Sequence, residues 1–464
     1  MTTSPARRAA FQILRRVELE GAYASVLLAG LDPEMREDDR ALCHEVVLGV
    51  LRRQLWLDRL IEHCAKRRID KIDLPVKLAL RLGLYQLRFL SRIPPSAAVN
   101  ESVNLVRAAG LRSAASFANA VLRQATREPD YDPTAVTIDA DEKLAIETSH
   151  PRWLIRRWAN AFGFEETARF AHANNEPAPI AFRLTAKAHA NPDAAQEIIK
   201  ELERAGAQVP PSKIAPDAWR IARYRTPTLR GSEQVGSGEQ QIPTPAHLRE
   251  LSRDGRIYLQ DEASQLVAHL LGVQPGDRVL DVCAAPGSKA THLAALAPQA
   301  LIIAADLRAH RLRTLNELAK QQGADNITPV ACDATRRLPF ADASFDRVLV
   351  DAPCSGTGTL RRNPEIRWRI TADDIDELST KQTQILVSAS AAVRAGGRLV
   401  YSTCSIEPEE NEQVVENFLR EHEDFRRALL DVPAELQTET GAIRTWPHRG
   451  GTDGFFVAAF ERRA

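Results

Sequence analysis

The sequence predicts a multidomain protein with an all-α N-terminal domain, a small α+β middle domain and a C-terminal α/β domain built on a parallel sheet. Its 464 residues exceed what a single core normally holds. Apolar residues recur at helical spacing through the first 130 residues, whereas from about residue 235 short apolar runs alternate with helical ones. We therefore expect domains at residues 1–130, 145–234 and 235–464.

The composition is typical of a soluble globular protein, with 44% hydrophobic and 26% charged residues. No run approaches 18 apolar residues, and the opening MTTSPARRAAFQILRRVELEG places charges among its apolar positions, unlike a signal peptide. We therefore expect a cytoplasmic monomer with no membrane partner.

The cysteines are too few for a disulfide framework in a chain of this length, and none forms the CxxC pair that zinc sites use. They are Cys43, Cys64, Cys283, Cys332, Cys354 and Cys404. The sequence thus predicts free thiols, either buried or reactive, and no bound metal.

Charge is unevenly distributed, although the formal net charge is zero. Residues 1–130 contain 21 Lys and Arg against 15 Asp and Glu, a net charge of +6, which leaves −6 for the remainder. This asymmetry makes the N-terminal domain the better candidate for contacting nucleic-acid phosphates. An ordinary solvated, arginine-rich helical surface explains the charge as well.

Helical periodicity in the N-terminal domain is clear in AAFQILRRVELEG, LCHEVVLGVLRRQLWLDRLIEHC and VKLALRLGLYQLRFL. Prolines at Pro33, Pro75, Pro94 and Pro95 mark the breaks between helices. The stretches LGVLRRQLWLDRLI, LGLYQLRFLSRIPPSAAVNESVNLVR and FANAVLR resemble the NusB-type RNA-binding helical domain of antitermination factors. This resemblance implies that the N-terminal domain contacts RNA.

The middle domain follows an acidic stretch, EPDYDPTAVTIDADEKLAIE, which is typical of a linker. It contains a predicted helix in HPRWLIRRWANAFG, a strand in PAPIAFRLTAK and a second helix in NPDAAQEIIKELERAG. Trp153 and Trp158 lie among apolar residues of the first helix, so we expect them to pack rather than to stack on bases.

The C-terminal domain shows the strand and helix alternation of a doubly wound sheet. Predicted strands are DRVLDVCAA, LIIAADL, ITPVACDA, FDRVLVDAP, GRLVYSTCS and FFVAAFERR. In such sheets ligands bind at the carboxyl ends of the strands. Carboxylates stand at four successive ends, at Asp281, Asp306, Asp333 and Asp351.

The first strand turns into its helix through CAAPGSK, whose small residues let a ligand approach the backbone. Asp306 ends the next strand, where a carboxylate can hold both hydroxyls of a ribose. Because the loop is neither GxGxxG nor GxxxxGK[ST], a nicotinamide or nucleoside-triphosphate site is disfavoured. A cofactor with an adenosine but no phosphates fits better, and Asp333 is then suited to the adenine amino group.

VLDVCAAPGSKATHLA, VACDA, VDAPCSGTGTLRRNPEIRW and YSTCSIEPEENE resemble the RNA cytosine-5 methyltransferases, which have a Rossmann-like catalytic domain. With the NusB-type start, the chain is similar over its full length to the bacterial 16S ribosomal RNA cytosine-5 methyltransferase B family, the Fmu/Sun type. The resemblance implies small-subunit ribosomal RNA as substrate and S-adenosylmethionine as cofactor. The implied cofactor residues are Cys283, Ala284, Ala285, Pro286, Gly287, Ser288, Lys289, Asp306, Asp333 and Asp351.

One departure from the family pattern lies in the cofactor loop. The family usually has a second Gly followed by Lys and Thr or Ser, where this chain has Ser288, Lys289 and Ala290. Because Ser is small and can donate a hydrogen bond at a helix start, we expect cofactor binding to survive this change.

Cytosine-5 methylation explains why two cysteines follow two strands. Carbon 5 of cytosine is a weak nucleophile until a thiolate adds at carbon 6, so a covalent route divides the reaction into easier steps. The resemblance implies Cys404 as nucleophile and Cys354 as the residue for product release. The residues alone leave these two roles open, because related DNA enzymes use the cysteine that follows a proline. They also leave open whether Asp351 contacts the cofactor or ring nitrogen 3.

The segment RRNPEIRWR suggests RNA contacts by Arg361, Arg362, Arg367 and Arg369 around Trp368, with a solvated loop as the alternative. Two other functions remain open. A cytosine-5 methyltransferase of transfer RNA or DNA has no evident need of the N-terminal domain. An RNA-binding assembly factor has no evident need of two intact cysteine motifs.

Overall fold

The computed structural model describes residues 3–135, 137–224 and 246–464. Contacts within the chain define two compact units, one of Met1–Pro177 with Leu360–Arg369 and one of Ala178–Thr359 with Ile370–Ala464. The predicted boundary between residues 234 and 235 lies outside the described residues. The three domain boundaries therefore stay predictions.

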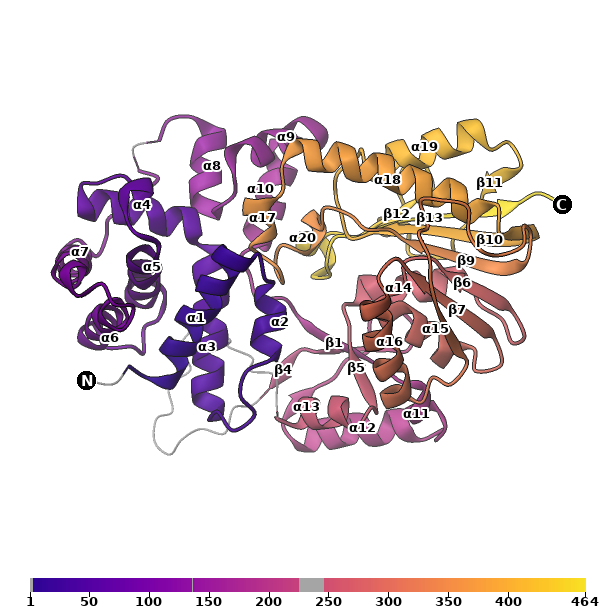
Figure 1. Cartoon of the computed structure of the whole chain (residues 1–464), viewed down its shortest axis with the longest axis horizontal. Coiled ribbons are helices and arrows are strands. Elements are labelled where there is room, and N and C mark those ends of the chain that lie inside the picture. The colour runs from indigo at the N-terminus through magenta and orange to yellow at the C-terminus, as the bar shows by residue number, and fades with distance from the viewer. Residues whose placement is uncertain (1–2, 136, 225–245) are drawn as a thin grey trace. The chain divides into compact units, whose positions relative to one another are not determined.

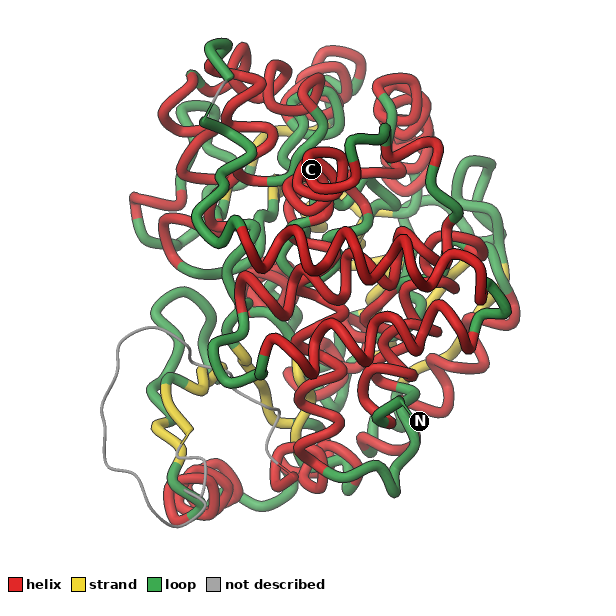
Figure 2. Tube along the Cα trace, turned by 90° about the vertical axis from the view of Figure 1, so that its left-hand side faces the viewer, coloured by secondary structure: helices red, strands yellow, loops and turns green. Residues whose placement is uncertain are grey.

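The first unit is built from helices, as the apolar periodicity predicts (Figure 2). Their apolar faces share one core, in which Leu57, Leu60, Leu78 and Leu82 are fully buried. This confirms the predicted all-α region. The helices are α1 Pro5–Glu20, α2 Ala24–Ala29, α3 Glu37–Arg52, α4 Gln54–Ala65, α5 Leu74–Phe89, α6 Pro95–Ala108, α7 Ala115–Arg127, α8 Ala140–Thr148, α9 Arg152–Phe162, α10 Phe164–Ala173 and α17 Ile366–Arg369.

Helix α8 lies inside the acidic stretch that the sequence predicts to be a linker, so that prediction is wrong for residues 140–148. Asp139 caps the helix by accepting a hydrogen bond of 2.8 Å from the backbone N–H of Glu142. Leu144 and Ile146 are buried, which anchors the helix. The predicted packing of Trp158 on α9 is confirmed, because its ring is fully buried against Phe170.

The second unit begins with a three-stranded antiparallel sheet in the order β3-β1-β5. Phe182 of β1 and Ile198 of α12 are fully buried in the core under this sheet. The predicted small α+β region is therefore confirmed. Its elements are β1 Ile180–Leu184, α11 Ala186–His189, α12 Ala194–Arg204, β2 Ala207–Gln208, β3 Ala218–Ile221, β4 Arg223–Tyr224, α13 Ala246–Arg253 and β5 Ile257–Leu259.

An eight-stranded sheet forms the rest of this unit, in the order β11-β13-β10-β9-β6-β7-β8, with β12 also paired to β13. Its strands are β6 Arg278–Asp281, β7 Leu301–Asp306, β8 Ile327–Ala331, β9 Phe345–Asp351, β10 Val393–Thr403, β11 Phe425–Arg427, β12 Ile443–Arg444 and β13 Phe456–Arg462. The five strands from β8 to β10 are parallel, as predicted.

The sheet is mixed rather than wholly parallel, because β13 runs antiparallel to β10, β11 and β12. A parallel neighbour needs a crossover of a dozen or more residues, usually a helix. Only the four-residue helix α20, Pro447–Gly450, lies between β12 and β13. This short link accounts for the antiparallel β12–β13 pair. The antiparallel β13 corrects the prediction of a wholly parallel sheet.

Helices cover both faces of this sheet (Figure 1). Alternate strand residues belong to two different cores: Leu280 and Tyr401 pack in the core that includes α18 and α19, whereas Val279 and Val400 pack in the core that includes α14 and α15. The helices are α14 Glu262–Leu271, α15 Ser288–Leu296, α16 Ala309–Gln322, α18 Ala372–Ser390 and α19 Glu412–Glu421. This confirms the predicted Rossmann-like α/β architecture.

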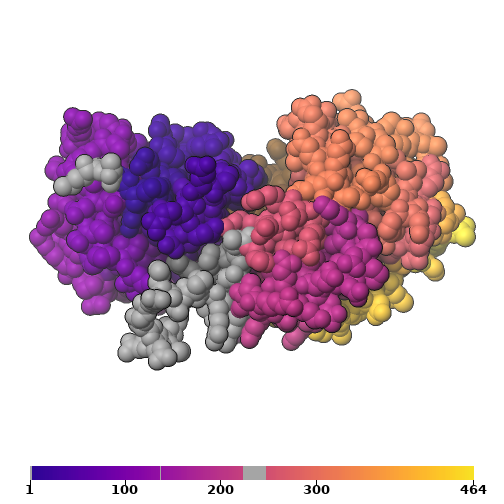
Figure 3. Space-filling model, turned by 90° about the horizontal axis from the view of Figure 1, so that it is seen from below, coloured from indigo at the N-terminus to yellow at the C-terminus, as the bar shows by residue number. Residues whose placement is uncertain are grey.

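The small sheet and the large sheet belong to one compact unit. In Figure 3 this unit forms one continuous surface, coloured from magenta to yellow along the chain. Arg183 of β1 joins them. It is buried and donates to the backbone carbonyl of Ser288 at 3.1 Å and to Thr291 Oγ1 at 2.9 Å on α15. Among the residues described, no helix is long and apolar enough to cross a membrane.

Candidate active site

The four strand-end aspartates lie at one edge of the large sheet. Asp281, Asp306 and Asp351 are the last residues of β6, β7 and β9, and Asp333 follows β8 by two residues. Because β8, β7, β6 and β9 are adjacent and parallel, the sequence prediction that their carboxyl ends meet is confirmed.

Asp281 is almost completely buried, and its Oδ2 has no hydrogen-bond partner among the described residues. Its Oδ1 accepts only a weak bond of 3.3 Å from the backbone N–H of Cys283. Burial, and then the nearby Asp351 carboxylate, raises the pKa of Asp281 to about 7. An unpaired acceptor in such a place suits a ligand that brings its own donor or positive charge.

The loop from Val282 to Gly287 leads from β6 into α15, whose first residue is Ser288. Gly287 has a φ of +113°, and a Cβ there would lie 3.0 Å from the side chain of Leu315 on α16. A glycine is therefore required at this turn. The open N-terminus of α15 faces the region where the aspartates end their strands, which suits a ligand held by backbone N–H groups.

Asp306 keeps part of its hydrogen-bonding capacity free. Its Oδ1 accepts from the N–H of Arg308 at 2.9 Å and its Oδ2 from the N–H of Ala285 at 3.3 Å. Arg311 Nη1 also lies 3.6 Å from Oδ2, an ion-pair distance that is too long for a hydrogen bond. A carboxylate has about four acceptor sites, so two remain for the hydrogen bonds of a ligand diol. The N–H of Ala285 also ties this carboxylate to the loop before α15.

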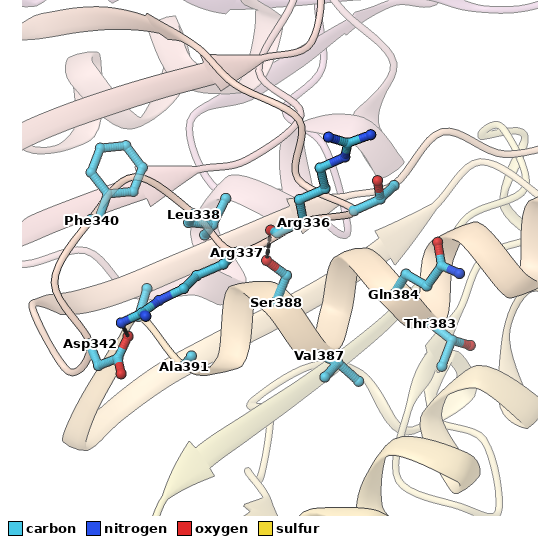
Figure 4. A pocket seen from close by; sticks show the side chains of 12 residues that line it. Arg336, Arg337, Leu338, Phe340, Asp342, Thr383, Gln384, Val387, Ser388 and Ala391 are labelled. Atoms are coloured by element: carbon cyan, nitrogen blue, oxygen red, sulfur yellow. Dashed lines mark hydrogen bonds and ion pairs between the residues drawn. The ribbon is translucent and has the colours of Figure 1, made fainter.

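Asp333 is the most open of the four aspartates. Its Oδ1 accepts from the N–H and the hydroxyl of Thr335, which lowers the pKa of Asp333 below its usual value. A neighbouring cavity of about 490 Å³ lies between the loop after Asp333 and α18 (Figure 4). Phe340 and Val387 line it, and neither Cys354 nor Cys404 does, so it lies apart from the thiols.

Lys289 connects the loop to the reaction site. Its Nζ lies 2.6 Å from Asp351 Oδ2, and Asp351 Oδ1 accepts from Ser402 Oγ at 2.8 Å. Burial lowers the pKa of Lys289, but Asp351 and, more weakly, Cys404 outweigh it and raise that pKa above its ordinary value. Lys289 therefore stays cationic next to Asp351 and interacts electrostatically with Cys404. The sequence places Lys289 with the cofactor and does not reveal these contacts.

The two motif cysteines lie together, with their Sγ atoms 3.3 Å apart. Cys354 follows β9 and Cys404 follows β10, and these strands are parallel neighbours. The hydrogen bond to Cys404, and then burial, raises the pKa of Cys354 well above its usual value. Cys354 therefore tends to hold its proton, in hydrogen-bond contact with the sulfur of Cys404.

The other cysteines are also free thiols, as predicted. Burial raises the pKa of Cys283 and of Cys332, and the neighbouring aspartates raise it further. Burial also raises the pKa of Cys43 to about 12 and that of Cys64 to about 11. None of these four has the environment of a reactive thiolate.

The predicted RNA contact by the RRNPEIRWR segment is wrong for Arg361 and Arg367, which are buried within the first unit. Arg367 donates to the backbone carbonyls of Thr148 and Ser149, each at 3.1 Å. Burial, and then Arg52 and Arg53, lowers the pKa of Arg367 to about 9. These arginines hold the segment to the helices instead of facing solvent.

Sequence reasoning missed two residues that bring the cysteine loops together. Glu410 is fully buried and accepts hydrogen bonds from both loops, at Ser355 and at Ser405. Gly358 packs so closely that a Cβ there would lie 1.9 Å from the carbonyl oxygen of Gly454 and 2.9 Å from that of Cys404. The signals that the sequence offers are the glycines after Cys354 in PCSGTG and the glutamates after Cys404 in TCSIEPEE.

Family models match three successive parts of the chain. A model described as 16S rRNA methyltransferase RsmB/F matches residues 268–461. A NusB family model matches residues 4–127, and a model described as a Methyltr_RsmF/B-like, ferredoxin-like domain matches residues 150–226.

Full-length relatives show the same order. The probable ribosomal RNA small subunit methyltransferase B of Bacillus subtilis is 32% identical over 100% of both chains. The probable ribosomal RNA small subunit methyltransferase B of Synechocystis sp. is 34% identical over 98% of this chain and 99% of its own. The solved structure titled "Crystal Structure of PH0851" is 28% identical, with a TM-score of 0.79 over 99% of this chain and 100% of its own.

These comparisons confirm the resemblance read from the sequence, including the NusB-type start, and they confirm S-adenosylmethionine as the cofactor. The match to the relatives extends over both units and through both cysteine motifs. The chain belongs to the ribosomal RNA small subunit methyltransferase B family.

Proposed function

We propose that this protein methylates carbon 5 of one cytosine in small-subunit ribosomal RNA, with Cys404 as the covalent nucleophile and Cys354 as the residue for product release. The observation that carries the proposal is the pair of thiols 3.3 Å apart, in a site where β9 also ends at Asp351, the partner of Lys289. The names of the relatives, ribosomal RNA small subunit methyltransferase B, support the substrate class.

The residues at the strand ends fit S-adenosylmethionine. Asp306 has two acceptor sites left for the ribose hydroxyls, and the open Asp333 suits the adenine amino group. The unpaired, buried Oδ2 of Asp281 suits the amino group of the methionine part, since only a donor relieves its isolation. When bound, this cofactor supplies an electrophilic methyl group on a sulfonium.

We assign the role of nucleophile to Cys404, as the family resemblance implies. The covalent route needs a thiolate to attack the ring. Cys354 keeps its proton, because the hydrogen bond to Cys404 and burial raise its pKa well above the ordinary value. Cys354 is therefore the poorer nucleophile of the pair, which leaves Cys404 for the attack.

The reaction follows from these roles. The Cys404 thiolate forms a bond to carbon 6 of the ring, and the displaced electron pair makes carbon 5 nucleophilic enough to take the methyl group. Lys289 and Asp351 form an ion pair of 2.6 Å, and we assign to this pair the stabilisation of charge that develops on the ring. The proton on carbon 5 then leaves to solvent, the electron pair of that C–H bond forms the carbon 5–carbon 6 double bond, and the sulfur–carbon 6 bond breaks with its pair on Cys404, which restores the thiolate. We assign to Cys354 the role of stabilising the departing sulfur by a hydrogen bond, since the two Sγ atoms lie 3.3 Å apart.

Bisulfite sequencing of total RNA tests the proposal. A strain from which the coding sequence is deleted should lose one methylcytosine in the small-subunit ribosomal RNA, and a copy of the wild-type sequence should restore it. A copy carrying Cys404→Ala should not. Loss of a methylcytosine from a transfer RNA instead would support the alternative substrate, and loss of none would support an assembly factor without this activity.

A further inference from the structure

Glu410 has a carboxylate with no access to solvent and a full set of hydrogen bonds. Its Oε1 accepts from the backbone N–H of Ser355 and from Gln382 Nε2, each at 2.8 Å. Its Oε2 accepts from the hydroxyls of Ser355 and Ser405. A carboxylate has about four acceptor sites, so these four donors, all neutral, satisfy it completely.

The donors come from both cysteine loops. Ser355 directly follows Cys354, and Ser405 directly follows Cys404. The two seryl hydroxyls also lie 2.9 Å from each other. One buried carboxylate therefore holds the residues next to both thiols, which are 3.3 Å apart.

Glu410 is itself fixed to rigid elements. The hydroxyl of Tyr401 on β10 donates to the backbone carbonyl of Glu410 at 2.5 Å. Gln382 on α18 donates both to Glu410 and to the carbonyl of Pro353, at 2.9 Å, which lies before Cys354. Glu410 thus connects both cysteine loops to the large sheet and to α18.

We propose that Glu410 is the positioning residue that sets the separation of the two thiols, by holding both cysteine loops on one carboxylate. Replacement by Ala removes the acceptor for four donors and lets the loops move apart. Replacement by Gln keeps one oxygen for the Ser355 N–H and Gln382, and its NH₂ group can donate to the seryl hydroxyls, which rotate to accept. The catalytic consequence of this role rests on the proposed function, whereas the positional role does not.

Bridging by dibromobimane, a reagent that becomes fluorescent when both its arms alkylate thiols, measures the separation directly. The full-length wild-type protein should be bridged between Cys354 and Cys404, as located by mass spectrometry of its peptides. Glu410→Ala should be bridged at least tenfold more slowly, although both thiols still react with monobromobimane, and Glu410→Gln should restore most of the bridging. Bridging of Glu410→Ala at the wild-type rate overturns the inference.

Glu262→Ala is the matched control, because Glu262 is also buried but accepts its hydrogen bonds from Arg220 and not from Ser355 or Ser405. It should be bridged like wild type. If circular dichroism shows that Glu410→Ala does not fold, Ser405→Ala replaces it, since it deletes one of the four donors and should slow bridging. A wild-type rate in that variant overturns the inference.

Activity gives a second measure. Glu410→Ala should lower kcat for RNA methylation at least tenfold and leave the KM for S-adenosylmethionine unchanged, because the cofactor residues are not among its partners. If bridging behaves as expected but the wild-type protein forms no methylcytosine, the positional role stands and the proposed function fails. If the wild-type protein forms methylcytosine but Glu410→Ala is bridged at the wild-type rate, the proposed function stands and the positional role of Glu410 fails.

Discussion

Cys354 Sγ lies 3.3 Å from Cys404 Sγ, at the ends of two parallel neighbouring strands. Asp351 at the end of β9 is paired with Ser402 of β10, so Cys354 and Cys404 follow the paired positions by three and two residues. Gly358 then donates from its N–H to the carbonyl of Cys404 at 2.9 Å, which links the two loops. The strand register thus places the loops side by side, and the hydrogen bonds that the loops make fix the spacing of the thiols.

Asp306→Ala should weaken S-adenosylmethionine binding without unfolding the protein. Hydrogen bonds to a charged group contribute about 1.5–3 kcal/mol, so we expect a loss of roughly tenfold or more in affinity. Isothermal titration calorimetry measures it, with the exposed Asp325→Ala as control. Equal affinities for Asp306→Ala and wild type would remove Asp306 from the cofactor site.

Gly358→Ala should abolish methylation. A Cβ at this position would lie 1.9 Å from the carbonyl oxygen of Gly454, which forces the two backbones apart and shifts the loop of Cys354. Gly110→Ala is a control with no atom within 4 Å of the added Cβ, although its φ of +86° costs some stability. Cofactor affinity should survive in Gly358→Ala while RNA methylation is lost. Normal methylation would show that the site tolerates this displacement.

Asp281→Asn should change how stability depends on pH. The pKa of Asp281 is about 7 in the folded protein, whereas an aspartate in an unfolded chain titrates near about 4. The folded state therefore binds this proton more tightly, and the free energy of unfolding falls as pH rises from about 4 to about 7. The Asn variant, neutral at all pH values, lacks this loss.

Without cofactor, Asp281→Asn should be more stable than wild type at pH 8, by on the order of 1–4 kcal/mol, and the difference should shrink at pH 5. Thermal unfolding at the two pH values, followed by circular dichroism, measures it. A difference that does not change with pH would show that the carboxyl is not protonated in the folded state near neutrality.

The first unit has a basic hollow of about 500 Å³ lined by Arg59, Lys66, Arg67 and Arg68, together with Glu62. If RNA phosphates bind there, Arg67→Ala with Arg68→Ala should weaken RNA binding and reduce the slope of log affinity against log salt by about two. Filter binding at several salt concentrations measures both, with the exposed Lys320→Ala as control. Unchanged affinity and slope would place the RNA surface elsewhere.

The sequence was sufficient for the parts of the fold that depend on local pattern. Strand-end carboxylates such as Asp281 and Asp306 follow directly from apolar runs that end at an acid, and the parallel strands align these ends. The sequence also points to both cysteines, because each follows such a run.

Features that depend on distant partners were not predictable. A charged residue such as Arg367 is expected on the surface, but its acceptors are backbone carbonyls and one amide side chain more than 190 residues earlier in the chain. Glu410 takes two of its donors from Ser355, 55 residues away. The segment around α8 is acidic and is therefore predicted from the sequence to be a linker. Burial of Leu144 and Ile146 against other helices makes it a helix instead.

Denaturing electrophoresis of RNA incubated with the protein and S-adenosylmethionine tests the central claim most directly, because only a covalent protein–RNA adduct survives it. Cys354→Ala should accumulate the adduct, since attack and methyl transfer proceed while release stalls. Cys404→Ala and the double variant should form neither the adduct nor methylcytosine. An adduct from Cys404→Ala and none from Cys354→Ala would reverse the two roles, and full activity in both single variants would contradict the covalent mechanism.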